Sequence, residues 1–352
     1  MGQPVRFDGT CERGHSITDD LGRYVAWVAV CPEVGAGMGV PRSPLRLVGS
    51  RSDRPNRLRL VTIDGADDVT DAVAAYSRAA CEHLANFDLC GFVFKSGSPT
   101  CGMERVRVYD NPLAGTADMV HEGGVGLFAE ALHRRLPDVP TEQEDRLGDP
   151  VVREAFLDAV FAYARWQDLL SRDIRADILG DFHRRNKYLL RTYSPAHRAE
   201  LDQLVAQAGR SGSGELRTRY GSLYMDAFKT RATPARHAET MYIMAGHLQW
   251  RISVNARRII HEAIEDYCDG LAPRRVPITL LRHYAREKGI LSLSEQSYID
   301  PYPKPLRPSI SPGGVHRITG RLAVASRHRS HRIHALEHAT HSSREERRCM
   351  YS

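Results

Sequence analysis

The chain has 352 residues, which is long enough for two domains with separate hydrophobic cores. It contains 42% hydrophobic and 26% charged residues, with no run of 18 apolar residues and no leader of the secretory type, so we expect neither a transmembrane helix nor a signal peptide. The net charge of +6 comes from positions 307–352, where nine arginines accompany three acidic residues, and the preceding part holds 40 basic and 40 acidic residues. A uniformly basic surface for nucleic acid is therefore excluded for that part, and any such interaction depends on local patches or on the C-terminal segment.

Short strands alternate with helices in the first half of the sequence. Residues 1–10 carry no strand or helix pattern and predict a loop. Runs rich in β-branched and aromatic residues predict four strands, at 24–30, 58–63, 91–95 and 105–110, and apolar residues at helical spacing predict helices at 68–87 and 125–135. This order predicts an α/β fold in which a small parallel sheet carries flanking helices.

The sequence becomes helical from Asp149-Pro150 onward, and no further strand is expected after residue 110. Proline after a capping residue marks helix starts at Ser194-Pro195 and Thr233-Pro234, and Val276-Pro277 marks another. A helix begins at Asp149-Pro150, and six more are expected at about 176–191, 195–208, 215–229, 234–248, 252–269 and 277–288.

Three parts of the chain follow from these patterns. We expect the α/β domain at residues 1–170 and an all-α domain at residues 171–306. Residues 307–352 are rich in arginine and histidine and poor in apolar residues, which predicts a disordered basic tail.

Two loops present cysteines just after predicted strands. Cys31 follows the strand at 24–30, and Cys101 lies in a Ser-Gly-Ser-Pro-Thr-Cys-Gly turn after the strand at 91–95. Ligands of open α/β sheets gather outside the carboxyl ends of the strands, and soft thiolates select iron–sulfur clusters, zinc or copper(I). The alternative is that both thiols are small buried hydrophobic groups, since their spacing matches no compact metal-binding motif.

Several motifs resemble the thiouracil desulfurase family. They are V-R-F-D-G at 5–9, C-P-E-V at 31–34, G-x-x-x-P-R-x-P at 37–44, S-P-T-C-G at 98–102 and R-L-x-D-P-x-x-R-E-x-F at 146–156. The later part resembles the YbgA-like helical domain, through F-H-x-x-x-K-Y-L-L at 182–190, S-P-A-H at 194–197, V-P-I-T-L-L-R-H-Y at 276–284 and Q-S-Y-I-D-P-Y-P at 296–303. Together the two resemblances cover residues 1 to about 306.

The resemblance implies that the N-terminal domain binds a 4Fe-4S cluster through three cysteines, which leave one iron without a protein ligand. The family uses this iron to bind the sulfur of a thiolated pyrimidine, which is removed without net redox change. Fusions to the YbgA-like domain are associated with desulfuration of 4-thiouridine in tRNA. Thiocarbonyl sulfur is a soft donor, so the chemistry suits such an iron.

Carried over to this sequence, the resemblance makes Cys31 and Cys101 cluster ligands. Glu33 matches a glutamate beside the cluster that moves protons as water attacks the thiocarbonyl carbon. Ser98 matches a serine that donates to substrate or to bound sulfide. Three further residues of the motifs are either substrate contacts or groups that order the loops through ion pairs: Arg6, Asp8 and Arg42.

The chain departs from the family pattern at its start. The family places its first cysteine in an S-x-C-L-x-G motif, and Met1-Gly2 falls inside that motif. We therefore expect the first cysteine, with the first strand of the sheet, to be encoded upstream of Met1, and Cys11 is the alternative third ligand. Cys81, Cys90 and Cys268 are expected to be core or surface thiols.

A basic cluster in the helical domain is the candidate tRNA contact. Arg184, Arg185 and Lys187 fall within about one helical turn, and such patches contact phosphates. The alternative is a solvated helix face.

Three functions remain open at this point. The first is iron–sulfur-dependent, non-redox desulfuration of 4-thiouridine in tRNA; the second is the same chemistry on free thiouracil or another thiopyrimidine. The third is a catalytically dead RNA-binding protein that lacks the first cluster cysteine. Seven cysteines without a secretory signal predict a cytoplasmic location and no membrane partner, and the oligomeric state stays open.

Overall fold

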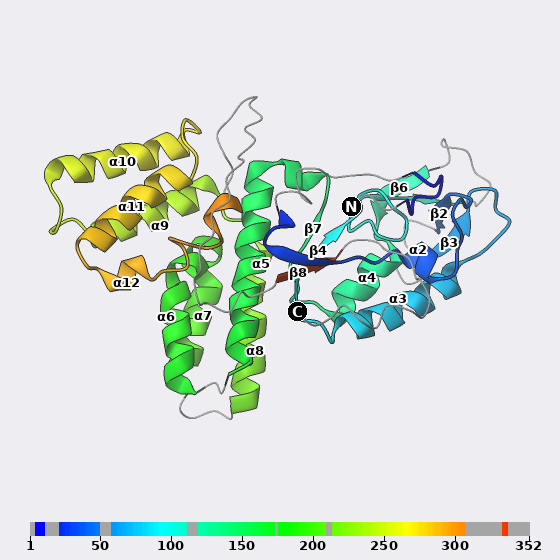
Figure 1. Ribbon diagram of the computed structural model, residues 1–352, viewed down its shortest axis with the longest axis horizontal. Coiled ribbons are helices and arrows are strands. Elements are labelled where there is room, and N and C mark those ends of the chain that lie inside the picture. The colour runs from blue at the N-terminus through cyan, green and yellow to red at the C-terminus, as the bar shows by residue number, and fades with distance from the viewer. Residues whose placement is uncertain are drawn as a thin grey trace. The chain divides into compact units, whose positions relative to one another are not determined.

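The computed structural model describes residues 4–10, 21–49, 58–110, 119–172, 175–208, 213–306 and 333–336. The chain forms two compact units, Met1–Arg153 with Arg332–Ser352 and Glu154–His331 (Figure 1). Among the described residues, no helix combines the length and the apolar character needed to cross a membrane.

The first unit contains a sheet in which every strand pair is parallel. Its order is β1 (Val25–Val28), β8 (Ile333–Leu336), β4 (Leu89–Phe94) and β7 (Thr141–Gln143). All six residues of β4 are buried, as expected for a strand of a parallel sheet that is covered on both faces. Helix α4 (Leu127–Arg135) packs on this strand, because the ring of Phe128 lies 5.7 Å from that of Phe92.

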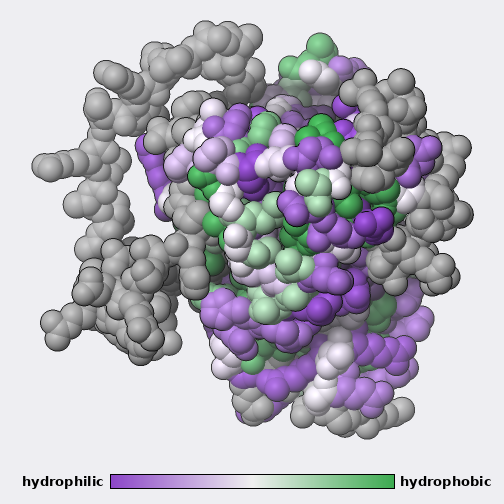
Figure 2. All heavy atoms as spheres, turned by 90° about the vertical axis from the view of Figure 1, so that its right-hand side faces the viewer, coloured by the Kyte–Doolittle hydropathy of each residue, from purple (hydrophilic) through white to green (hydrophobic). Residues whose placement is uncertain are grey.

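A second sheet of the same unit is mixed. Its order is β3 (Arg59–Thr62), β2 (Leu45–Val48), β5 (Val106–Tyr109) and β6 (Met119–Gly124), and only the β2–β5 pair is parallel. Leu47, Leu60 and Val108 are fully buried and pack with Val73 of helix α3 (Thr70–Leu84). The face of the molecule turned to the viewer in Figure 2 mixes hydrophilic residues with smaller hydrophobic areas.

The α/β fold of this unit is confirmed, but the prediction of a single parallel sheet is wrong, because there are two sheets and the second contains antiparallel pairs. The strand content differs from the prediction as well. β6 and β7 both follow residue 110, so the expectation of no strand there is wrong. β6 contains His, Glu and two glycines, and β7 is a three-residue Thr-Glu-Gln segment, so neither has the apolar alternation that predicts a strand. β2 was missed as well, because its four residues follow a proline-containing loop.

Strand β8 lies within the segment that the sequence predicts to be a disordered tail. Its backbone pairs with β1 on one side and with β4 on the other. The sequence analysis expects the first strand of the sheet to be missing from the N-terminal part. In the structure, β8 from the C-terminal part lies in the sheet between β1 and β4.

The second unit is helical throughout its described residues, as predicted. After α5 (Pro150–Leu170) come α6 (Ala176–Tyr193), α7 (Pro195–Ala206), α8 (Ser213–Asp226), α9 (Pro234–Gly246), α10 (Val254–Cys268), α11 (Arg275–Glu287) and α12 (Leu291–Ser294). The predicted caps are present: the hydroxyls of Ser194 and Thr233 accept hydrogen bonds from backbone amides of the first turn, and proline follows each.

The core of this unit explains where the chain divides. Trp166 of α5 packs among aromatic residues of α6 and α8, with its ring 5.2 Å from that of Tyr220. Asp158 of α5 is fully buried and accepts a 2.7 Å bond from Arg274, which is 4% exposed. Because these α5 side chains lie in the helical core, the compact units divide at Arg153, whereas the predicted domains meet at residue 170.

Candidate functional site

Cys31 and Glu33 are presented by a short helix rather than by the predicted loop. The chain leaves β1 at Val28, Cys31 takes the N-cap position of α2 (Pro32–Gly35), and Glu33 lies in its first turn. Proline at the first helical position and an acidic residue in the first turn both favour a helix start here. A Cβ at Gly35 would collide with the ring of Tyr76, so glycine lets α2 lie against α3.

Ser98 organises the turn that carries Cys101. Its Oγ accepts hydrogen bonds from the backbone amides of Thr100, at 3.3 Å, and Cys101, at 3.2 Å. A Cβ at Gly126 would collide with the carbonyl of Thr100, so a glycine lets the chain before α4 approach this turn. The turn is therefore held by the side chain of Ser98 and by the close approach of the chain at Gly126.

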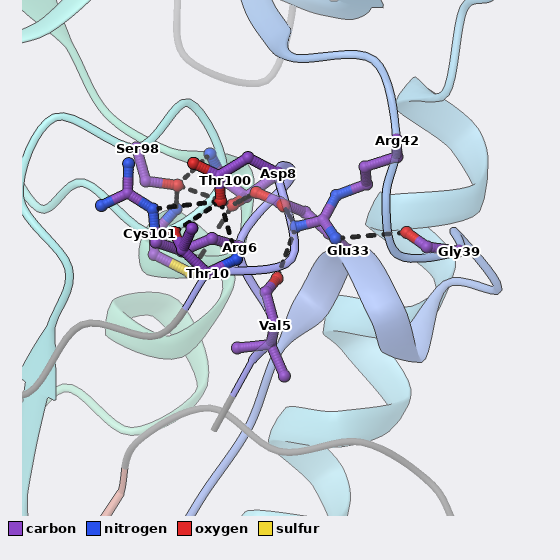
Figure 3. A network of polar contacts seen from close by, with 10 residues as sticks. All are labelled: Val5, Arg6, Asp8, Thr10, Glu33, Gly39, Arg42, Ser98, Thr100 and Cys101. Atoms are coloured by element: carbon purple, nitrogen blue, oxygen red, sulfur yellow. Dashed lines mark hydrogen bonds and ion pairs between the residues drawn. The ribbon is translucent and has the colours of Figure 1, made fainter. Parts of the chain in front are cut away.

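The two segments meet through a chain of hydroxyl groups (Figure 3). Thr100, which is fully buried, donates from Oγ1 to Oε1 of Glu33 over 2.8 Å. Its oxygen lies 2.9 Å from Oγ of Ser98. Since the single hydroxyl proton of Thr100 is used on Glu33, the Ser98 hydroxyl is the donor in this second bond. Ser98 is thus connected to Glu33 through Thr100.

Arg42 holds the other oxygen of Glu33. Its Nη2 donates to Oε2 of Glu33 and, over 3.0 Å, to the carbonyl of Val5, while Nη1 donates to the carbonyl of Gly39 over 3.3 Å. The side chains of Arg42 and Glu33 are 7% and 16% exposed, so water screens this ion pair little. Arg42 therefore connects the 4–10 segment to α2 and fixes Glu33 (Figure 3).

Arg6 and Asp8 belong to a more exposed part of the same network. Asp8 Oδ1 accepts from the amide of Thr10 at 3.0 Å and from its hydroxyl at 2.6 Å, and these bonds hold the pKa of Asp8 below its usual value. Arg6 Nε lies 3.6 Å from the same carboxylate, with both side chains about two-fifths exposed. These contacts fit the loop-ordering alternative, and a role in substrate binding stays a prediction.

Cys31 and Cys101 belong to the two segments that the bond from Thr100 to Glu33 joins. They are 4% and 2% exposed, and burial raises the pKa of both thiols, with the negative charge of Glu33 acting in the same direction. The charge of a Cys31 thiolate would act in the same direction on Cys101. Thiols in this setting stay protonated unless a cation binds them and favours the thiolate.

The described residues supply two of the three thiolates that a cluster of the expected kind needs. They contain no group of three metal-ligating side chains. Cys81 and Cys90 are buried in the core and Cys268 is exposed, as expected for structural thiols, while Cys11 lies outside the described residues. The donor set of the described residues matches a cluster in chemistry but is incomplete in number.

Thr100 is the site residue that the sequence did not indicate. It occupies the variable position of the S-P-x-C-G turn, and it is separated from Glu33 by 67 positions. Its place immediately before Cys101 was the only available signal.

The basic cluster on α6 is largely neutralised by carboxylates. Arg184 and Arg185 bind Asp181 at 2.6 Å and 2.7 Å, and Glu295 lies within 3.6 Å of both. Lys187 differs: within the described part of the chain it has no carboxylate at ion-pair distance, and its Nζ lies 4.7 Å from the ring centre of Tyr188. Partial burial lowers the pKa of Lys187, and the nearby Arg198 and Arg184 lower it further.

Comparisons with known proteins agree with this division. Residues 1–144 match the 2-thiouracil desulfurase family, and residues 187–303 match DUF1722, a family of unknown function. One solved structure, a 4Fe-4S-dependent thiouracil desulfidase called TudS, is 27% identical over 44% of this chain and 91% of its own, with a TM-score of 0.32 that establishes no common arrangement. None of the curated proteins matches the chain. The chain thus carries a 2-thiouracil desulfurase domain in its N-terminal part, followed by a DUF1722 domain.

Proposed function

We propose that the chain hydrolyses the thiocarbonyl group of a thiolated pyrimidine, with 4-thiouridine in tRNA as the substrate. The oxygen of water bonds to the ring carbon, the carbon–sulfur bond breaks, and sulfur leaves as hydrogen sulfide. A carbonyl replaces the thiocarbonyl, so no electrons are gained or lost and no external oxidant or reductant is needed.

The arrangement around Glu33 is the observation that carries the proposal. Its two carboxylate oxygens are held by Arg42 and Thr100, and it lies two residues from Cys31 on the helix that Cys31 caps. A positioned carboxylate of this kind takes a proton from attacking water, and typically contributes about 10²- to 10⁴-fold in rate. Ser98 supplies a hydroxyl for the substrate or the departing sulfur, and Thr100 links it to Glu33.

The proposed cofactor is a 4Fe-4S cluster held by Cys31, Cys101 and a third thiolate. The described residues do not supply this third thiolate at the site. Such a cluster supplies an iron without a protein ligand, which is a soft Lewis acid for sulfur. Burial disfavours free thiolates at Cys31 and Cys101, and binding of a cationic centre offsets that cost.

The choice of tRNA rests on the resemblance of the C-terminal half to the YbgA-like domain. Of the three residues expected to contact tRNA, Lys187 has the basic group without a carboxylate partner among the described residues, while Arg184 and Arg185 must exchange theirs for phosphate. A free thiopyrimidine is the second candidate substrate, favoured by the match of residues 1–144 to the 2-thiouracil desulfurase family.

Sulfide release from three substrates separates these possibilities. The anaerobically reconstituted protein is supplied with 2-thiouracil, 4-thiouridine and tRNA that contains 4-thiouridine. The proposal predicts the highest kcat/KM with tRNA and a loss of about 10²- to 10⁴-fold in Glu33→Gln, with iron content unchanged. Faster turnover of 2-thiouracil favours the second candidate, and an absence of sulfide from all three refutes a desulfidase function.

A further inference from the structure

The connection between α9 and α10 exposes the side chain of Trp250. This residue is 87% exposed, and Val254, at the first position of α10, is 72% exposed. Tryptophan is usually well buried because its ring carries a large apolar surface, as in Trp166 of the same unit, which is 4% exposed. A large aromatic ring left in water is available for stacking on a partner.

Three arginines follow this tryptophan in the chain. Residues 247–258 contain Arg251, Arg257 and Arg258 and no acidic residue. Arg258 is paired with Glu262 one turn along the helix. Within the described residues, Arg251 and Arg257 have no carboxylate at ion-pair distance, so both are available to an anion.

The distribution of charged residues along α10 is the reverse of the distribution that stabilises a helix. Its N-terminal end carries the arginines, whereas the C-terminal end carries Glu265 and Asp266 in the last turn and Asp269 just beyond it. The helix dipole favours the opposite distribution, with acidic residues at the N-terminus and basic residues at the C-terminus. The distribution is therefore not explained by helix stability, and it creates one basic and one acidic end.

We propose that Trp250, Arg251 and Arg257 form an RNA-binding surface, in which the indole stacks on an unpaired base and the guanidinium groups contact the adjacent phosphates. The inference rests on the proposed function, because tRNA is the RNA that the enzyme would meet. A single exposed ring suits one base, and every base offers a face for stacking. The apolar part consists of Trp250 and Val254 and is too small for the core of a stable protein interface.

Leu271 provides a matched control for this surface. It is 77% exposed and follows the acidic end of the same helix, so its replacement removes a comparable exposed apolar side chain away from the arginines. Trp250→Ala, Trp250→Phe, Leu271→Ala and Arg251→Ala/Arg257→Ala variants are compared in the full chain, with unmodified tRNA as the probe. Binding is measured by fluorescence anisotropy of labelled tRNA at several salt concentrations.

We expect Trp250→Ala to weaken tRNA binding roughly 5- to 150-fold, the range for loss of one stacked base, and Trp250→Phe to restore most of it. Loss of both arginines should flatten the slope of log K against log salt by about one to two units. Turnover of free 2-thiouracil should not change in any of the four variants.

Equal tRNA affinity of Trp250→Ala and Leu271→Ala overturns the inference, as does a change of oligomeric state in Trp250→Ala without a change in tRNA affinity. A different result would refute the proposed function and leave this inference in place: the wild-type chain would bind tRNA through Trp250 but release no sulfide from tRNA that contains 4-thiouridine.

Discussion

Removing the hydroxyl of Thr100 tests the connection between Ser98 and Glu33. Thr100→Val keeps the shape of the side chain in a position with no exposed surface, and it removes the 2.8 Å bond to Glu33 and the 2.9 Å bond to Ser98. The bond to Glu33 joins a hydroxyl to a carboxylate, and hydrogen bonds to charged groups contribute about 1.5–3 kcal/mol. If that bond holds Glu33 in its reacting position, the rate constant falls by about 10- to 150-fold.

The assay is sulfide release under single-turnover conditions, with iron content measured on the same preparations. Thr100→Ser is the matched variant, because it keeps the hydroxyl and loses only a methyl group. We expect Thr100→Ser to retain most of the activity, and all three proteins to hold the same amount of iron.

Two results would refute this reasoning. Full activity in Thr100→Val would show that the hydroxyl chain does not serve the reaction. Equal losses in Thr100→Val and Thr100→Ser would show that the shape of the side chain, and not its hydroxyl, matters.

Three further predictions concern the thiols and the helical core. In iron-free protein at pH 8, iodoacetamide should modify the exposed Cys268 well before Cys31 and Cys101, because burial raises the pKa of the latter two and only the thiolate reacts. The rates are measured by mass spectrometry of peptides, and equal rates for the three cysteines would contradict the burial of Cys31 and Cys101. Burial lowers the pKa of His237 well below 6.5, so below pH 6.5 the unfolded chain binds a proton that the folded chain does not. The free energy of unfolding, measured with urea, should therefore decrease by up to about 1.4 kcal/mol for each unit by which the pH is lowered below 6.5. His237→Gln should flatten this dependence, and His283→Gln, at an exposed position, should leave it in place. Arg274→Met should destabilise the helical unit by about 3–5 kcal/mol, because it removes the positive charge paired with the fully buried Asp158 and leaves that carboxylate only its bond from Tyr193. Arg258→Ala at an exposed pair should cost at most about 1 kcal/mol, and similar losses in the two variants would contradict the buried ion pair.

The helices were predictable from the sequence because their signals are local. Ser194-Pro195 and Thr233-Pro234 place a capping hydroxyl and a proline at the helix start, and the structure has both caps. The strands that were missed lack such signals. β7 is only Thr-Glu-Gln, and it is a strand because it pairs with β4, a contact that joins Phe92 to Thr141.

The candidate site shows the same limit. Cys31, Glu33, Ser98 and Cys101 were predicted from motifs, and the structure brings the two segments together through the bond from Thr100 to Glu33. The bond from Thr100 to Glu33 joins positions 67 residues apart and depends on how distant loops pack, which no local pattern encodes. Arg42 and Glu33 are only nine residues apart, but their pairing depends on how the loop after α2 folds back. For the same reason the sequence did not predict all acidic partners of the basic cluster on α6, since Glu295, which binds Arg184, lies 111 positions away in the sequence.

The source of the oxygen in the product tests the central proposal most directly. The anaerobically reconstituted protein is incubated with tRNA containing 4-thiouridine in ¹⁸O-labelled water without added reductant, and the nucleosides and sulfide are quantified. Hydrolysis predicts one sulfide for each uridine formed, with the label in that uridine, and no turnover in Cys31→Ala or Cys101→Ala. Uridine without the label, a requirement for a reductant, or full activity in either cysteine variant would contradict it.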